Sequence, residues 1–201
     1  MSADDPARGT SLYEESARYS ASVGDTARLA ATLQNLAVNT WESGDHRGAV
    51  NGFERALEVA RQAGHKVGIS ISLMSLAEAE RALGEYQRAM VYFGESLQTA
   101  RRLGLKEVVV EALYGVAGLA VDAGDYGWAG AVLGAAQREN DFGHDFDLES
   151  MRQIHDNTLA SIKENLGADG MERAIAAGRA LTLDSVLEYL RGAGSVGLRS
   201  S

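Results

Sequence analysis

The stretch LAVNTWESGDHRGAVNGFERA, residues 36–56, decides the fold because the chain repeats its pattern at intervals of forty residues. The second copy, residues 76–96, reads LAEAERALGEYQRAMVYFGES, and the third, residues 116–136, reads VAGLAVDAGDYGWAGAVLGAA. The copies agree at an alanine before the turn, at a glycine followed by an acid, and at an alanine after the turn. A fixed period of about 20 to 50 residues is typical of stacked repeats, in which each unit buries its apolar face against its neighbours.

Each unit predicts two helices joined at the glycine. In the second unit, apolar residues recur at helical spacing on both sides of Gly84, which supplies the positive φ that ends a helix. Upstream, residues 10–24 match only the second helix of a unit, because Tyr13 precedes Phe53 by forty residues. The pattern therefore predicts a half-repeat followed by three full repeats.

After Gly143 the period stops, and the sequence predicts three further helices. They cover about Leu148 to Leu166, the segment GMERAIAAGRAL, and LDSVLEYLRG with Thr182 as its N-cap. We expect them to cover the end of the stack, since a terminal repeat must hide its apolar face. The predicted fold is a single elongated all-α domain, a right-handed α-solenoid of about three and a half helix pairs with a C-terminal helical cap. Its segments are a disordered N-terminus (1–9), a half-repeat (10–24), repeats 25–64, 65–104 and 105–143, the cap (144–191) and a disordered tail (192–201).

The composition favours a non-catalytic protein that binds neither nucleic acid nor membranes. The formal net charge of −9 repels phosphate backbones, which argues against direct nucleic-acid binding. Without cysteine the chain has neither disulfides nor thiolate chemistry, which fits a reducing compartment. No apolar run approaches the ~18 residues that span a bilayer, and the acidic start lacks the apolar core of a signal peptide. We therefore expect a cytoplasmic protein.

The repeat positions resemble the tetratricopeptide repeat, in which a small residue, a Gly-Asp turn, an alanine and an aromatic ring follow in this order. In the first unit these are Ala37, Gly44-Asp45, Ala49 and Phe53. Units of forty residues look like the long-helix variety found in bacterial regulators. The resemblance implies a concave groove lined by the first helix of each unit, and a function in binding a protein or peptide.

The C-terminal part resembles the end of bacterial LuxR-type and SARP-type signal-transduction ATPases. The matching segments are LGAAQRE (133–139) and the run from Leu166 through Gly178-Arg179-Ala180-Leu181-Thr182-Leu183. This resemblance implies the sensor or scaffold end of a bacterial transcription-regulatory system. The sequence has no G-x-x-x-x-G-K-[ST] phosphate loop and no basic helix-turn-helix segment, so the family's nucleotide chemistry and DNA binding do not carry over. The half-repeat at the start favours a piece of a longer regulator over a stand-alone relative.

By register, the first helices project polar and aromatic side chains into the groove. We predict that a partner protein or peptide contacts Gln34, Asn35, Trp41, Met74, Glu78, Arg81, Glu111 and Tyr114. Aromatic and guanidinium groups often dominate recognition, and the Asn35 amide is suited to hold a peptide backbone. For Trp41 and Tyr114, packing between helices stays open as an alternative, because aromatics at helical spacing are often core residues. The positions that clamp a terminal carboxylate in chaperone-binding members hold no cation here, which disfavours a chaperone adaptor.

No catalytic, cofactor-binding or metal-binding residue is predicted. His144 and His155 flank a segment with several acids, but their spacing matches no metal motif. The chain has no nucleophile-elbow motif, so we do not expect an enzyme.

Two alternative functions stay open. One is a small-ligand or signalling-peptide receptor that switches a partner, and the other is self-assembly into a homo-oligomer through residues 10–24. The glycines of the third unit also allow two interpretations, a close approach of helices, which we favour, or a soft hinge. These glycines are Gly115, Gly118, Gly127, Gly130 and Gly134.

Overall fold

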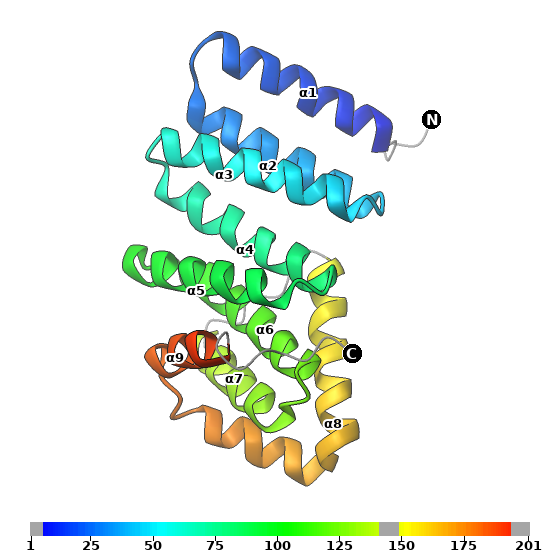
Figure 1. Ribbon diagram of the computed structural model, residues 1–201, viewed down its shortest axis with the longest axis vertical. Coiled ribbons are helices and arrows are strands. Elements are labelled where there is room, and N and C mark those ends of the chain that lie inside the picture. Colours follow the sequence, from blue (N-terminus) through cyan, green and yellow to red (C-terminus); the bar gives the residue numbers. More distant parts are fainter. Residues whose placement is uncertain (1–5, 141–148, 194–201) are drawn as a thin grey trace. The chain divides into compact units, whose positions relative to one another are not determined.

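The computed structural model describes residues 6–140 and 149–193, and within these ranges the chain is all-α, as the repeat pattern predicts (Figure 1). The first seven helices follow the repeat, and the last two follow the point where the period stops. The helices are α1 (Pro6–Ser22), α2 (Thr26–Glu42), α3 (His46–Gln62), α4 (Lys66–Ala82), α5 (Tyr86–Leu103), α6 (Lys106–Asp122), α7 (Tyr126–Glu139), α8 (Glu149–Gly178) and α9 (Leu183–Ala193).

The glycine-acid pairs lie at the turns between helices, which confirms the prediction from the repeat. Gly124 has φ of 75°, and the next residue, Asp125, donates its backbone N–H to the carbonyl of Ala120 at 2.9 Å. The Asp125 carboxylate then accepts the backbone N–H of Trp128 at 3.1 Å and caps α7. One dipeptide therefore ends a helix and begins the next. Positive φ values recur at Gly24, Gly44, Gly64, Gly84 and Gly104.

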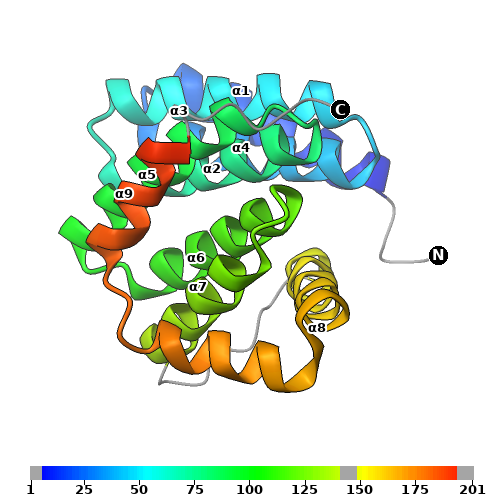
Figure 2. The same cartoon turned by 60° about the horizontal axis from the view of Figure 1, so that its bottom comes forward.

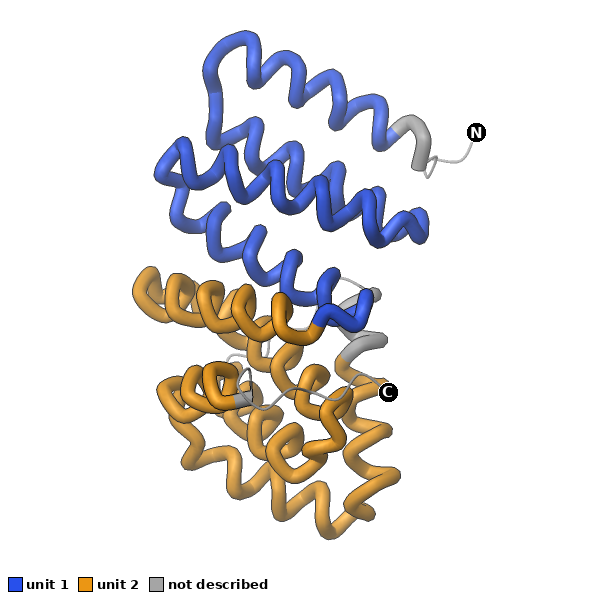
Figure 3. The backbone as a smooth tube through the Cα atoms, in the orientation of Figure 1, with its two compact units in different colours: residues 1–85 blue, residues 86–201 orange. Residues whose placement is uncertain are grey.

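The chain divides into two compact units, residues 1–85 and 86–201 (Figure 3). The division falls at the Gly84-Glu85 turn, inside the second predicted repeat. Helix α4 therefore belongs to unit 1 and α5 to unit 2. The repeat pattern runs through this turn unchanged, so the sequence carries no signal for the division.

In unit 1, each helix packs against the next, and α2 also contacts α4. Small residues allow this close packing. A Cβ atom placed on Gly52 of α3 would lie 2.7 Å from the Cβ of Ala37 in α2, so the two helices could not accommodate a larger residue there. Ala49 and Phe53, which lie close to Gly52 in the sequence of α3, are buried, as the repeat pattern predicts.

In unit 2, the two C-terminal helices return to different parts of the repeat. Helix α8 packs against α7 and α6, whereas α9 packs against α5 (Figures 1 and 2). Helix α8 is interrupted at Gly167, where φ is 71° and ψ is 171°, directly after the helix end that the sequence predicts at Leu166. Thr182 caps α9 as predicted, because its hydroxyl accepts the backbone N–H of Ser185 at 3.1 Å.

The ends of the described chain differ slightly from the predicted boundaries. Helix α1 begins at Pro6, so residues 6–9, predicted to be disordered, are helical. Proline suits the first turn of a helix because the N–H that it lacks has no partner there. Residues 1–5 and 194–201, for which the sequence predicts disorder, lie outside the described residues. Within the described part, no helix combines the length and apolar character needed to cross a membrane.

Candidate protein-interaction surface

Six of the predicted groove residues belong to unit 1 and lie on α2 and α4, the first helices of two consecutive repeats. These two helices are in contact. We define the α2–α4 face as the set of residues that helical spacing predicts to share one side of these two helices: Gln34, Asn35, Val38, Trp41, Ile71, Met74, Glu78 and Arg81.

Gln34 is hydrogen-bonded within unit 1. Its amide nitrogen donates to the Ser75 hydroxyl at 2.7 Å, and its amide oxygen accepts from the Ser72 hydroxyl at 3.1 Å. Both serines belong to α4, so one side chain joins the two helices of the face. Gln34 therefore helps to hold α2 against α4, and the partner contact predicted for it stays a prediction.

The centre of the α2–α4 face combines one exposed amide with apolar side chains. Asn35 is exposed, and the apolar residues of the face, Val38 on α2 and Ile71 and Met74 on α4, are half-buried. A primary amide presents both donors and an acceptor, which match the carbonyl and N–H of a peptide group. This arrangement is suited to hold a peptide backbone over an apolar surface.

The aromatic and charged residues of the face contact other residues of the protein. The half-buried Trp41 ring lies 4.1 Å from the His46 ring, centroid to centroid, at an interplanar angle of 42°. The Arg81 guanidinium and the Glu78 carboxylate form an ion pair at 3.5 Å, and their side chains are 17% and 14% exposed. Trp41 therefore combines packing with partial exposure, and the two charges largely offset each other.

The two predicted groove residues of unit 2 lie on α6, where α8 packs. Tyr114 is only 5% exposed, and its ring meets His155 of α8 edge-on at 4.8 Å. Burial raises the pKa of Tyr114, and a hydrogen bond with Asn140 acts in the opposite direction. Glu111 is half-buried, and desolvation, followed by repulsion from Glu107, raises the pKa of its carboxyl group. Tyr114 is thus a packing residue, the alternative left open by its spacing.

Helix α7 holds the C-terminal helices of unit 2 through contacts that the sequence did not reveal. Arg138 donates from one guanidinium nitrogen to the backbone carbonyls of Arg179 and Leu181, both at 2.8 Å. The Trp128 ring stacks on Tyr189 of α9 at 4.7 Å. Burial, and then the negative charge of Asp125, raises the pKa of Tyr189 to about 12.

The close-approach interpretation is confirmed for two glycines of α7. A Cβ atom on Gly130 would lie 2.6 Å from the Cβ of Ala174, and one on Gly134 would overlap with the backbone carbonyl of Ile175. Gly127, by contrast, has open space where a Cβ atom would stand. The segments 133–139 and 178–183, which carry the resemblance to bacterial regulators, therefore contact each other in unit 2.

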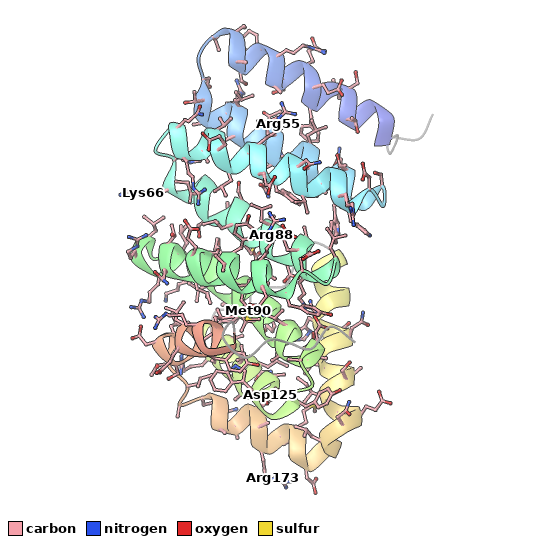
Figure 4. All side chains as sticks on the ribbon, in the orientation of Figure 1. Arg55, Lys66, Arg88, Met90, Asp125 and Arg173 are labelled. Atoms are coloured by element: carbon pink, nitrogen blue, oxygen red, sulfur yellow. The ribbon has the colours of Figure 1, made fainter. Side chains whose placement is uncertain are left out.

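A cleft of about 600 Å³ lies between α5 and α9 in unit 2, and Met90 is placed between these helices in Figure 4. The Arg101–Asp184 ion pair, at 2.6 Å, also joins the two helices. None of the predicted groove residues lines this cleft, since they lie on α2, α4 and α6 and the cleft lies between α5 and α9. The lining residues are Gln87, Met90, Val91, Gly94, Glu95, Gln98, Leu187, Leu190 and Arg191.

Across residues 6–140 and 149–193, no three histidine or acidic side chains cluster closely enough to hold a metal ion. Of the histidines considered as ligands, His144 lies outside the described residues, and His155 contacts Tyr114 and Asp156.

The paired helices and the α2–α4 face define a helical-repeat domain of the kind that offers a surface to a partner. The family model of the tetratricopeptide repeat matches residues 29–63 and 71–103, which supports a tetratricopeptide-repeat domain. The two matches contain all the unit 1 residues of the predicted groove. Tetratricopeptide repeats are generally protein-interaction modules and typically non-catalytic scaffolds. Comparisons with curated proteins and with solved structures found no match.

Proposed function

We propose that the α2–α4 face binds a short segment of a partner protein or a peptide, without catalysis. The observation that carries this proposal is the exposed Asn35 amide on α2, a helix that also carries the half-buried Val38 and contacts α4, the helix of Met74, in two repeats that match the tetratricopeptide family. The amide would pair with the backbone of the segment, while apolar side chains of the segment would cover the apolar part of the face.

The charges of the face favour a segment of low net charge. Glu78 and Arg81 pair with each other at 3.5 Å, so neither sign dominates at this end of the face. In chaperone-binding members of the family, cations at several repeat positions hold the terminal carboxylate of the partner. Among those positions, Asn35, Val38 and Ser75 of this chain are uncharged, so a terminal carboxylate would find no cluster of cations here.

Selection from a random peptide display library tests the proposal. Peptides that bind the chain would be counter-selected against the double variant Asn35→Ala, Met74→Ala, and their affinities measured by fluorescence polarisation. Asn35→Ala alone should weaken binding about tenfold, since it removes the hydrogen bonds of one amide, worth roughly 1–1.5 kcal/mol in net terms.

The matched control is Arg55→Ala, which replaces an exposed residue of α3 (Figure 4) and should leave the affinity unchanged. Selected peptides that bind the Asn35→Ala variant as tightly as the wild type would contradict the proposal, as would a selection that yields no binder.

We propose further that this module is the sensor or scaffold end of a bacterial transcription-regulatory system. The resemblance of segments 133–139 and 178–183 supports this, together with the Arg138 hydrogen bonds that make the two segments one structural element. The reading frame around the coding sequence tests it. An ATPase and a DNA-binding segment encoded in the same frame or in an adjacent gene are expected, and their absence from both contradicts this role.

A small-ligand receptor is the second candidate function, and the α5–α9 cleft favours it. The cleft volume of about 600 Å³ lies within the range of ligand pockets, and Gln87, Gln98 and Arg191 offer polar groups. Thermal-shift screening with a metabolite library tests this function. A genuine ligand should lose its shift in Gly94→Leu, which fills the cleft from its wall, and keep it in Asn35→Ala.

A further inference from the structure

The cleft between α5 and α9 combines buried apolar side chains with exposed polar ones. Met90 of α5 and Leu187 and Leu190 of α9 line the cleft and are buried, so they form its apolar floor. Gln87 and Gln98 line it from α5 and are exposed, so they belong to its rim. A cleft of this kind suits a ligand that has an apolar body and a polar end group.

Gly94 leaves room in the α5 wall of the cleft. Glycine in the middle of a helix is less favourable than alanine, so its contacts should explain its presence. In the forty-residue register Gly94 corresponds to Gly134, where a Cβ atom would overlap with the backbone carbonyl of Ile175. A Cβ atom on Gly94 would instead lie 4.0 Å from Cδ1 of Leu190, which is an ordinary contact distance. The packing of α9 therefore does not require this glycine, and the space beside it is open to a ligand.

The two helices of the cleft run in opposite directions. Arg101, near the end of α5, pairs with Asp184, near the start of α9, at 2.6 Å. Gly94, which comes earlier on α5, lies beside Leu190, which comes later on α9. Arg191 therefore lies toward the start of α5, so the cleft has one end that carries a guanidinium group.

This guanidinium group can hold an anion. Arg191 lines the cleft and is exposed, and no ion pair joins it to another residue of the described ranges 6–140 and 149–193. A guanidinium group binds a carboxylate through two parallel hydrogen bonds. The Gln87 amide, which lines the cleft near the start of α5, can donate a further hydrogen bond to the same group.

The other charges disfavour a ligand with more than one negative charge. Glu95 lines the same cleft and is exposed, and the chain has a net charge of −9. A phosphate monoester or a dicarboxylate would bring a second negative charge into this surrounding, where like charges repel. A single carboxylate is matched by Arg191 alone.

We propose that the ligand of the α5–α9 cleft is an amphiphilic monocarboxylate, which rests on the small-ligand function proposed above for this cleft. The carboxylate pairs with Arg191, and the apolar chain lies on the floor of the cleft beside Gly94. From Gln87 to Gln98 the lining residues of α5 extend over about 16 Å of helix, at 1.5 Å per residue, which sets the length of chain that fits.

Amide NMR spectra of the isotope-labelled full chain, titrated with octanoate, test the proposal. Octanoate has about ten non-hydrogen atoms, so a dissociation constant on the order of 1 mM is expected. The resonances that shift should be those of the cleft, with Gly94 and Leu190 among them. Octyl phosphate, octylamine and octanol carry the same chain with a different end group and should bind at least about fivefold more weakly.

Substitutions separate the end group from the cleft. Arg191→Gln should weaken octanoate binding about tenfold and leave octanol binding unchanged, since it removes only charge-assisted hydrogen bonds. The matched control is Arg173→Gln on α8 (Figure 4), an exposed arginine outside the cleft that should not affect octanoate. Gly94→Leu should abolish the binding of both octanoate and octanol, because its side chain fills the space beside the floor.

The outcomes distinguish the ligand class from the site. The monocarboxylate is wrong if octanol or octylamine binds the cleft as tightly as octanoate, or if Arg191→Gln leaves octanoate binding unchanged. It is also wrong if about 10 mM octanoate, well above the expected dissociation constant, shifts no cleft resonance. The cleft itself fails as a ligand site only if the metabolite screen yields no ligand that Gly94→Leu abolishes. Asn35→Ala should leave octanoate binding unchanged, so peptide binding is tested separately.

Discussion

Units 1 and 2 use the same repeat register but leave different faces accessible. Gln34, Met74 and Tyr114 occupy one repeat position at intervals of forty residues. In unit 1, Gln34 and Met74 are half-buried on the α2–α4 face, whereas in unit 2 Tyr114 is 5% exposed because α8 covers α6. The register thus determines which residues share a face, and the elements that follow the repeats decide whether that face can meet a partner.

The small residues of the two units also serve different contacts. In unit 1, Gly52 allows the two helices of one repeat to pack closely at Ala37. In unit 2, Gly130 and Gly134 allow a repeat helix to approach α8, which lies outside the repeat. Gly130 and Gly134, which look like weak points of a helix in the sequence, are therefore contact positions for α8 of the C-terminal cap.

The largest effect on stability is expected from a substitution that adds a side chain at the tight contact between α7 and α8. Gly134→Ala should destabilise unit 2 by about 2–3 kcal/mol, because its Cβ atom would overlap with the Ile175 carbonyl, which is backbone and must shift as a whole. Urea denaturation followed by circular dichroism measures this. Gly127→Ala on the same helix meets open space and should leave stability unchanged or raise it by up to about 1 kcal/mol. Equal effects of both substitutions would refute the tight α7–α8 contact.

The next effect concerns the attachment of the cap to the repeat. Arg138→Ala removes the donor for the carbonyls of Arg179 and Leu181 and should cost about 1–2 kcal/mol. Hydrogen exchange measured by mass spectrometry should accelerate in α9 and remain unchanged in α2. Arg138→Lys keeps the charge but loses the planar fork, so an intermediate rate is expected. Exchange in α9 that Arg138→Ala does not change contradicts a positioning role for this residue.

In unit 1, substitutions of the neighbouring residues Gln34 and Asn35 test whether their two amides have different roles. Gln34→Ala should cost about 1 kcal/mol of stability, because it leaves Ser72 and Ser75 of α4 without their shared partner. Asn35→Ala should leave the urea midpoint unchanged, since Asn35 is exposed. If Asn35→Ala destabilised the chain as much as Gln34→Ala, the assignment of one amide to positioning and the other to partner contact would be wrong.

The smallest expected effect is a pH-dependent change in stability that involves Glu111 of unit 2. The folded state raises the pKa of Glu111 above its ordinary value of 4.5, chiefly by burial, so it holds the proton more tightly than the unfolded chain. The stability that this protonated carboxyl contributes is fully present below pH 4.5 and is lost as the pH rises through the raised pKa. Glu111→Gln, which stays neutral, should therefore be more stable than the wild type at pH 7.

Thermal denaturation at pH 7 and at pH 4 measures this difference, which should shrink at the lower pH. The exposed Glu172→Gln is the control and should show no comparable change between the two pH values. A Glu111→Gln advantage that is equal at both values would mean that burial of the charge is not its cause.

The sequence by itself determined the helices, their turns and the membership of each face. These features are local, because a glycine at positive φ ends a helix and the next aspartate caps the following one, as at Gly124 and Asp125. A period of forty residues then repeats the same local pattern, and from this period the sequence predicts Asn35 and Met74 on one face.

Only the tertiary structure decided which of those residues remain accessible. The covering of Tyr114 by α8 and the contact of α9 with α5 join segments that lie far apart in the chain and outside the period. The bridging role of Gln34 likewise depends on serines about forty residues away. Such contacts arise from side-chain shape and hydrogen-bond geometry between non-adjacent helices, and helical periodicity carries no signal for either.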